Sequence, residues 1–255
     1  MPLIVHTIPA FTDNYIWLFH SQGENQAYVV DPGDAVPVLE TLHRLKLSLK
    51  GILITHHHAD HVGGIDQLLK EYSVPVYAPE GIPQATAIMK DGASLNIANQ
   101  TFQVISIPGH TLDHIAYFSA NESLVFCGDT LFSNGCGRLF EGTPDQMWHS
   151  LSRLASLPAD TKIYCAHEYT EANTRFALVV EPDNEVLQQR AIEIEELRQQ
   201  NKPTIPSTLS KELANNPFLR TGQQSIQEAA RRHSNQPLLS ESEIFAALRH
   251  WKDCF

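Results

Sequence analysis

The sequence is poor in positive charge and has no long apolar run. Its 255 residues include 18 Lys and Arg against 29 Asp and Glu, which gives a net charge of -11 at pH 7. A chain with this balance lacks broad electrostatic attraction to nucleic acid or to an anionic membrane surface. No apolar stretch approaches the ~18 residues of a membrane-spanning helix. The composition therefore disfavours nucleic-acid and membrane partners and is typical of a globular protein. We expect this protein to be a monomer.

Basic residues are absent from the first part of the chain, and cysteines are few. No Lys or Arg precedes Arg44, which disfavours a secretory signal or an Arg-rich transit peptide. The four cysteines include no Cys-x-x-Cys pair, so a disulfide framework is not expected. Cys127 and Cys165 follow apolar runs and are expected to be small buried side chains. These features favour a reducing compartment, the cytoplasm.

Metal-ligating side chains, in contrast, are concentrated in one short segment. Residues 55–64 read THHHADHVGG, directly after the apolar run 51–54. Four His and one Asp within six residues, placed after a buried strand, can point into one small space. Imidazole and carboxylate groups suit zinc and similar metals. A solvated His-rich loop is the alternative, but the position after an apolar run favours a metal site.

Three further segments repeat this pattern of an apolar run followed by a ligand in a turn. His110 follows the run 102–107, Asp129 follows 124–126, and His167 follows 162–164. A single His after a strand is usually a cap or a buried structural residue. Because sites in open sheets form beyond the strand ends, four such segments can meet at one rim.

The number of ligands predicts two divalent ions, with zinc the best match and iron or manganese also suitable. One ion takes His56, His58 and His110. The other takes Asp60, His61 and His167, and Asp129 has two carboxylate oxygens with which to bridge them. Each ion keeps an open position for water, and two neighbouring ions can share a nucleophilic hydroxide. The residues alone therefore predict a binuclear metal hydrolase. As a further hypothesis, we expect Asp60 and Asp129 to be its catalytic carboxylates.

The chain changes character after His167. Residues 1–167 alternate short β-type runs with helical patterns at 36–47 and 63–72 and a helix that starts at Thr143. From residue 171 the β-type runs stop, and 186–200, 225–232 and 240–252 show helical spacing. We predict an α/β domain over 1–167 and a small all-helical domain over 168–255. In the last helix Arg249 and Lys252 share a face, where they either clamp a carboxylate or complement the helix dipole; spacing alone favours the dipole.

Several of these motifs together resemble a known family. Segment 55–64 is similar to the metallo-β-lactamase signature, which implies an αββα sandwich with two metals at one edge. The whole chain more narrowly resembles glyoxalase II, the hydroxyacylglutathione hydrolases. The segments that carry this closer resemblance are 11–15 (FTDNY), 135–143 (GCGRLFEGT), 165–170 (CAHEYT), 216–220 (NPFLR) and 249–255 (RHWKDCF).

The resemblance implies the same ligands for each of the two ions. It also implies a glutathione site formed by Arg138, Tyr169, Arg249 and Lys252 beside Phe140. For Arg249 and Lys252 the resemblance favours a carboxylate clamp over interaction with the helix dipole. The reason is that an anionic ligand on a protein of charge -11 needs a local positive pocket. Phe140 stands where many relatives have Tyr, which puts one hydrogen bond to substrate in doubt. His57 is expected to point away from the metals, and His114 to be a structural neighbour.

The implied reaction is hydrolysis of the thioester S-D-lactoylglutathione to glutathione and D-lactate, the second step of methylglyoxal detoxification. The hydroxide attacks the carbonyl carbon, Asp60 orients it, and no Ser or Cys nucleophile is required. The main competing hypothesis is a glutathione-persulfide dioxygenase on the same fold, which would use one iron. A nuclease of the superfamily and a non-catalytic metal-binding protein also compete, and the acidic net charge disfavours the nuclease.

Overall fold

The computed structural model describes all 255 residues, which form two compact units. The first unit comprises residues 1–106 and 113–128, and the second comprises residues 107–112 and 129–255. The border predicted after residue 167 falls inside the second unit, so residues 129–167 are compact with the helices that follow them. The domain assignment itself stays a prediction.

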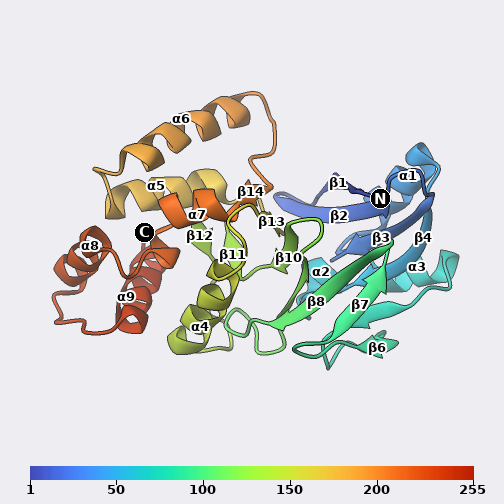
Figure 1. The fold of residues 1–255 in the computed structure, drawn as a ribbon, viewed down its shortest axis with the longest axis horizontal. Coiled ribbons are helices and arrows are strands. Elements are labelled where there is room, and N and C mark those ends of the chain that lie inside the picture. The colour runs from blue at the N-terminus through green and yellow to red at the C-terminus, as the bar shows by residue number, and fades with distance from the viewer. The chain divides into compact units, whose positions relative to one another are not determined.

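One six-stranded sheet lies entirely in the first unit (Figure 1). The first three strands are antiparallel neighbours, and the last four run parallel to one another. In order across the sheet they are β1 (Leu3–Ala10), β2 (Asn14–Ser21), β3 (Gln26–Val30), β4 (Ser48–Leu53), β5 (Val76–Ala78) and β6 (Ala87–Ile88). The connections from β3 to β4 and from β4 to β5 carry helices, and the second of them also carries the His-rich segment.

Helices α1 (Ala35–Leu45) and α3 (Ile65–Glu71) cover the outer face of this sheet (Figure 1). Val38 and Leu42 of α1 share a fully buried core with Ile65 and Leu68 of α3 and with the strands beneath them. The prediction of a helix over residues 63–72 is wrong at its start, because α3 begins only at Ile65. Residues 59–62 form a separate short helix, α2 (Ala59–Val62), and the chain bends at the two glycines that follow. The bend is fixed because Gly64 N–H donates to Pro32 O at 2.8 Å.

Four antiparallel strands of the first unit pack against the inner face of the sheet. They follow in the order β10 (Leu124–Gly128), β9 (Ile115–Ser119), β8 (Gln100–Ser106) and β7 (Ser94–Ile97). Phe19 of β2 meets Phe102 of β8 and Phe126 of β10, each with ring centroids 5.4 Å apart. The Tyr117 hydroxyl of β9 lies 3.0 Å from Ile54 O. These contacts fix the end of β4, immediately before the His-rich segment.

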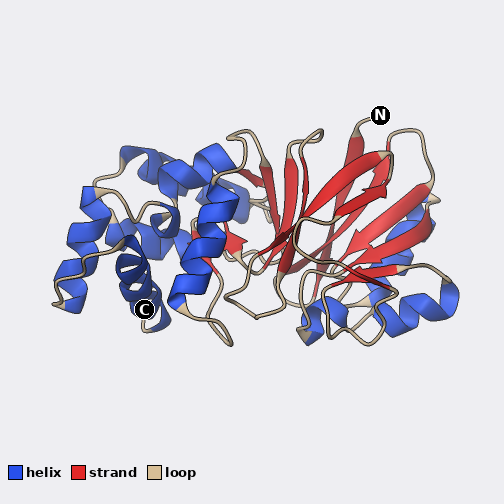
Figure 2. Cartoon of the chain, turned by 60° about the horizontal axis from the view of Figure 1, so that its bottom comes forward, coloured by secondary structure: helices blue, strands red, loops and turns tan.

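The second unit is mostly helical (Figure 2, blue). It contains the hairpin β11 (Leu131–Phe132) and β12 (Gly135–Cys136) and the antiparallel pair β13 (Lys162–Cys165) and β14 (Ser207–Thr208). Its helices are α4 (Pro144–Ala155), α5 (Thr170–Val180), α6 (Glu185–Gln199), α7 (Leu209–Asn215), the 3-10 turn η1 (Pro217–Leu219), α8 (Gln224–Ser234) and α9 (Glu241–Asp253).

Two predicted helix starts in this unit are confirmed. Thr143 with Gln146, and Ser240 with Glu243, form complete capping boxes in which side chain and backbone satisfy each other reciprocally. Helices α5 and α7 were not predicted, because neither has a strong apolar stripe of its own. Phe176 of α5, Phe218 of η1 and Phe245 of α9 are fully buried and form the aromatic centre of the helical part. No helix is long and apolar enough to cross a membrane.

Candidate metal centre

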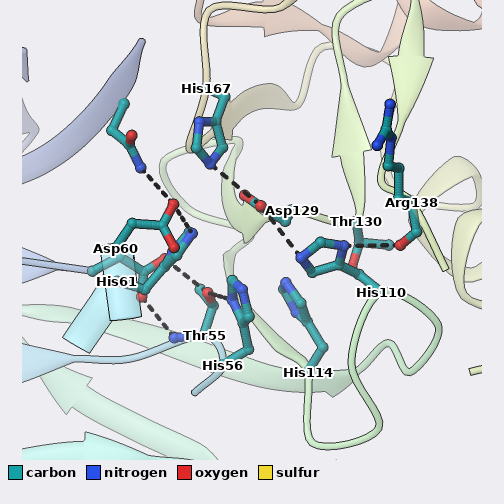
Figure 3. A network of polar contacts seen from close by, with 12 residues as sticks. Thr55, His56, Asp60, His61, His110, His114, Asp129, Thr130, Arg138 and His167 are labelled. Carbon is teal, nitrogen blue, oxygen red and sulfur yellow. Dashed lines mark hydrogen bonds and ion pairs between the residues drawn. The ribbon is translucent and has the colours of Figure 1, made fainter. Parts of the chain in front are cut away.

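The first ligand set stands on the segment that leaves β4 and runs through α2. His56 and His61 are completely buried, whereas His58 and Asp60 are half-buried. Because β4 is an interior parallel strand, its end delivers these side chains to the rim of the sheet. Figure 3 shows His56, Asp60 and His61 grouped beside Thr55.

Thr55 and Asp31 set the orientation of His56. Thr55 donates its hydroxyl proton to Asp31 Oδ2 at 2.7 Å and its backbone N–H to Asp31 Oδ1 at 2.8 Å. Since that hydroxyl proton is already committed, Thr55 Oγ1 can only accept from His56 Nδ1, which lies 3.0 Å away. The proton of a neutral His56 therefore resides on Nδ1, and the Nε2 lone pair is left as the ligating atom.

The same carboxylate also holds His61. Asp31 Oδ2 lies 3.1 Å from His61 Nδ1, and Asp60 Oδ2 lies 3.6 Å from His61 Nε2. The negative charge of Asp31 favours a proton on Nδ1 of neutral His61, and the Nε2 lone pair then faces an anionic oxygen. Asn14 donates to that same Asp60 oxygen at 3.0 Å and fixes the carboxylate. A cation between Nε2 and the carboxylate removes the repulsion, so this pair fits a metal ion.

Glycine is required where the turn after β3 meets this segment. Asp31 adopts a left-handed conformation, with φ of 51°, that turns the chain sharply at the end of β3. A Cβ atom at Gly33 would lie 1.8 Å from the backbone oxygen of Asp60. The turn can therefore approach the ligand segment only because residue 33 has no side chain.

Two neighbouring histidines are expected to stay outside the ligand set. His57 is exposed and pairs with Asp113, at 3.0 Å between Nδ1 and Oδ1, and its ring lies edge to face with that of His58 at 5.2 Å. His114 is fully buried, and its ring stacks on His56 with centroids 4.5 Å apart. His114 therefore packs directly on a proposed ligand, and both roles stay predictions.

The second ligand set, in the second unit, consists of His110, Asp129 and His167. All three are buried, each in a turn that directly follows an apolar run. The Nε2 atoms of His110 and His167 lie 3.4 and 3.3 Å from Asp129 Oδ2. Figure 3 shows the two rings on either side of this carboxylate.

The tautomer of His110 shows that this arrangement suits a cation. His110 Nδ1 lies 2.9 Å from the backbone oxygen of Arg138, which can only accept, so Nδ1 carries the proton. The Nε2 lone pair of the neutral ring then points at anionic Asp129. Two imidazole nitrogens that converge on one carboxylate oxygen are the donor set that zinc and related ions take. The residues present therefore fit a metal ion.

The three predicted cations gather near the end of α9 in the second unit. Arg249 is buried and donates from Nη1 to Cys136 O at 2.9 Å and from Nη2 to Asp253 Oδ1 at 3.0 Å. Its Nε is buried without a protein partner. Arg138 is exposed, with Nε 3.7 Å from Asp253 Oδ1. Burial, and then the neighbouring Arg249, lower the pKa of Lys252 to about 8.

The two predicted aromatic contacts both lie against metal-ligand candidates. Tyr169 stacks on His167 with ring centroids 4.7 Å apart and planes 6° from parallel. Phe140 meets His110 edge to face at 5.2 Å, and 63% of its surface is exposed. The structure thus gives both rings an exposed surface beside the second ligand set.

Sequence reasoning missed three groups that hold the first ligand set in place: Asn14, Asp31 and the Thr55 hydroxyl. Asn14 lies in the 11–15 motif, and Asp31 stands at a strand end before Pro32 and Gly33, so each had a signal. Neither could be assigned a partner without the fold, because Asp31 and Thr55 are 24 residues apart in the sequence.

Comparison with known proteins identifies the class. The sequence family described as the metallo-beta-lactamase superfamily matches residues 11–86 and 89–167. Among solved structures, a B3 metallo-beta-lactamase, BLEG-1, is 24% identical with a TM-score of 0.65 and covers 85% of this chain and 100% of its own. ETHE1 from Myxococcus xanthus is also 24% identical, with a TM-score of 0.67 over 98% of this chain and 99% of its own. These likenesses show the fold, and they place the chain in the metallo-β-lactamase superfamily.

Curated relatives narrow the assignment. Residues 168–255 match the family described as the hydroxyacylglutathione hydrolase C-terminus. Proteins named hydroxyacylglutathione hydrolase from Aliivibrio salmonicida and Aeromonas salmonicida are 50% and 52% identical. They align over 99% and 98% of this chain and over 100% and 99% of their own lengths. The chain belongs to the hydroxyacylglutathione hydrolase family. The predicted fold class, a metallo-β-lactamase fold followed by a helical C-terminal part, is confirmed.

Proposed function

We propose that this protein hydrolyses the thioester bond of S-D-lactoylglutathione, and of related 2-hydroxyacylglutathiones, with the aid of two divalent metal ions. The observation that carries the proposal is the match of residues 168–255 to the hydroxyacylglutathione hydrolase C-terminus, together with relatives of that name that are about half identical over nearly full length. Metallo-β-lactamase folds serve several chemistries, so the helical part, and not the fold, directs the proposal to this substrate.

The proposed centre holds two metal ions, with zinc as the best match and iron or manganese as further candidates. His56, His58 and His110 would hold one ion, and Asp60, His61 and His167 would hold the other. Asp129 would bridge them. When bound, such ions supply Lewis acidity and lower the pKa of a coordinated water. The tautomers set by Thr55 and by Arg138 O support this assignment, because each leaves an Nε2 lone pair for the metal.

The protein residues would then direct the attack. Asp60 is held through Oδ2 by Asn14 and would use its carboxylate to orient the attacking oxygen. That oxygen adds to the thioester carbonyl carbon, the carbon–sulfur bond breaks, and the sulfur departs with the bonding electrons as the glutathione thiolate. The new carbon–oxygen bond gives D-lactate, and the proton released from water is taken up by thiolate or solvent.

The cations near the end of α9 would bind the anionic glutathione portion. Arg138, Arg249 and Lys252 concentrate positive charge on a protein whose net charge is -11. Arg249 is itself buried between Cys136 O and Asp253, so it would contribute its positive charge to the site from beneath the surface. The exposed faces of Tyr169 and Phe140 would contact the apolar parts of the ligand. Residues 168–255 would thus serve as the substrate-binding domain.

The direct test is thioester hydrolysis followed by thiol release, with elemental analysis of the purified protein. D-lactoyl-N-acetylcysteamine is the matched substrate control, because it keeps the thioester but lacks both glutathione carboxylates. We expect rapid hydrolysis of S-D-lactoylglutathione, much slower hydrolysis of the control, and two metal ions per chain. Oxygen uptake with glutathione persulfide, and no thioester hydrolysis, would instead indicate the dioxygenase.

We further propose a monomeric cytoplasmic enzyme. Three of the four free cysteines are buried, which suits a reducing compartment. Sedimentation analysis of the purified protein and fractionation of the source cells test these two points.

A further inference from the structure

The hairpin β11–β12 is a buried insertion between two proposed functional residues, Asp129 and Arg138. Its strands pair Leu131 with Cys136 and Phe132 with Gly135, and Ser133 and Asn134 form the turn. All six residues, 131–136, are buried. Short surface hairpins usually expose their turns, so a buried polar turn requires partners in the surrounding structure.

The base of the hairpin is closed tightly around Asp129. Gly137 N–H donates to Thr130 O at 3.2 Å. A Cβ atom at Gly137 would lie 2.0 Å from the backbone oxygen of Asp129. Any shift of the hairpin is therefore transmitted to the backbone of Asp129, because nothing separates the two at the base.

Glu212 of α7 holds the tip of the hairpin. Its Oε1 accepts from Ser133 Oγ at 3.0 Å and from Ser207 Oγ. Its Oε2 accepts from Asn134 N–H at 2.7 Å and from Asn216 Nδ2 at 3.2 Å. Four donors thus occupy the two oxygens of a carboxylate that is only 1% exposed. Burial raises the pKa of Glu212, while these donors oppose the rise by stabilising its anion.

Other residues of the helical part bind the same hairpin. Asn216 Nδ2 donates to Phe132 O at 3.1 Å and to Gly135 O at 2.9 Å. Asn173 Nδ2 donates to Ser133 O at 3.0 Å, and Asn134 Nδ2 donates to Thr174 Oγ1 at 2.8 Å. These contacts come from α5 and from Asn216, the residue that joins α7 to η1. Glu212 is the only charged group among them.

We propose that Glu212 is a positioning residue for the metal centre: by fixing the β11–β12 tip, it holds Asp129 in the place from which it binds metal. The helical part then has a second role besides binding substrate, since it secures one ligand of the hydrolytic site. This inference rests on the proposed metal centre. It predicts that a substitution in α7, outside both ligand sets, weakens metal binding.

The chain provides a matched control in Glu181, a second buried carboxylate of the helical part. Glu181 accepts from Arg220, Asn184 and Ser225, and none of these residues lies in the hairpin. Glu212→Leu and Glu181→Leu both remove a buried carboxylate and leave its donors without a partner. Both should lower the melting temperature of the metal-free protein. Only Glu212→Leu should also weaken metal binding.

The measurement is the zinc dissociation constant of each variant, obtained by chelator competition at a temperature where circular dichroism shows the protein folded. We expect Glu212→Leu to bind zinc about tenfold or more weakly than the wild type, and Glu181→Leu to remain within about threefold. Glu212→Gln should recover most of the affinity, because the Ser133 and Ser207 hydroxyls can rotate to accept from its amide.

Wild-type zinc affinity in a folded Glu212→Leu variant, or equal losses in both Leu variants, would overturn the inference. If Glu212→Leu does not fold, Ser133→Ala and Ser225→Ala replace the two Leu variants. Ser133→Ala removes one donor to Glu212, and Ser225→Ala removes one donor to Glu181. We then expect weaker zinc binding in Ser133→Ala alone, and unchanged affinity in both would refute the proposal. A wild-type protein that binds no divalent metal would refute the proposed function itself, which distinguishes the two failures.

Discussion

The Nδ1 atom of His110 lies 2.9 Å from the backbone oxygen of Arg138. One hydrogen bond therefore joins a proposed metal ligand to the residue whose side chain is a proposed substrate-binding cation. Because Arg138 O can only accept, the bond also fixes the tautomer of His110. The geometry of the metal centre and that of the substrate site are thus linked through a single stretch of backbone.

Replacement of His110 should weaken metal binding and remove most of the activity. His110→Ala removes one of three proposed ligands of one ion and leaves His167 alone against Asp129 Oδ2, so we expect a metal content near half of the wild-type value and a fall in kcat/KM of at least about 100-fold. Elemental analysis and thioester hydrolysis measure the two effects. The control is His57→Ala, an exposed histidine in the His-rich segment, which should keep its metal. Equal behaviour of the two variants would contradict the assignment.

Asp31 should control metal affinity although it is not itself a proposed ligand. Asp31→Asn places an amide among donors from Thr55 and His61, so at least one contact becomes repulsive. Loss of such an orienting partner typically weakens metal binding 10- to 100-fold. Chelator competition gives the dissociation constant. Asp34→Asn serves as the control, because Asp34 only caps α1 and Asn caps equally well.

The KM for the glutathione thioester should rise with pH above about 8. Burial and the neighbouring Arg249 lower the pKa of Lys252 to about 8, so its ammonium group is charged below that pH and neutral above it. Only the charged form attracts a carboxylate, and the affinity is therefore lost as pH rises through the pKa. A Lys252→Gln variant should have a high KM at pH 7 that changes little up to pH 9. An identical pH profile in the variant and the wild type would exclude Lys252 from substrate binding.

Arg249 and Arg138 should differ in their effects on stability. Arg249→Ala removes the donor to the buried Cys136 carbonyl and should lower the free energy of unfolding by about 1–3 kcal/mol. Arg138 is exposed, so Arg138→Ala should change stability by less than about 0.5 kcal/mol. Both variants should raise KM more than they lower kcat, because these contacts lie away from the reacting carbon. An unchanged KM for Arg249→Ala would discard its substrate role, whatever the denaturation curve shows.

Phe140→Tyr should strengthen substrate binding. The ring already packs against His110 and is 63% exposed, so a hydroxyl can be added without a clash. One additional hydrogen bond contributes about 1 kcal/mol, which corresponds to a roughly fivefold lower KM. Steady-state kinetics at pH 7 measure the effect. A KM equal to or above that of the wild type would show that residue 140 does not face the substrate.

The His and Asp residues that cluster in the structure could be singled out from the sequence because each follows an apolar run, and strands deliver their ends to a common rim; their role as metal ligands stays a prediction. Capping at Thr143 and Ser240 was also predictable, since it depends on residues only three apart. Helices α5 and α7 could not be predicted, because their burial depends on neighbours distant in the sequence. For the same reason the interruption at Gly63 and Gly64 was missed: it is caused by the turn at Pro32 and Gly33.

The sequence by itself determined that this chain carries a set of candidate metal ligands followed by a helical part of the hydroxyacylglutathione hydrolase family. Only the tertiary structure decided which atoms of those ligands are available. Asp31 holds the Thr55 hydroxyl that sets the proton of His56, the carbonyl of Arg138 sets that of His110, and Glu212 secures the hairpin beside Asp129. Apart from the adjacent Thr55 and His56, these are contacts between residues tens of positions apart, and hydrogen-bond direction depends on where folding places each donor and acceptor.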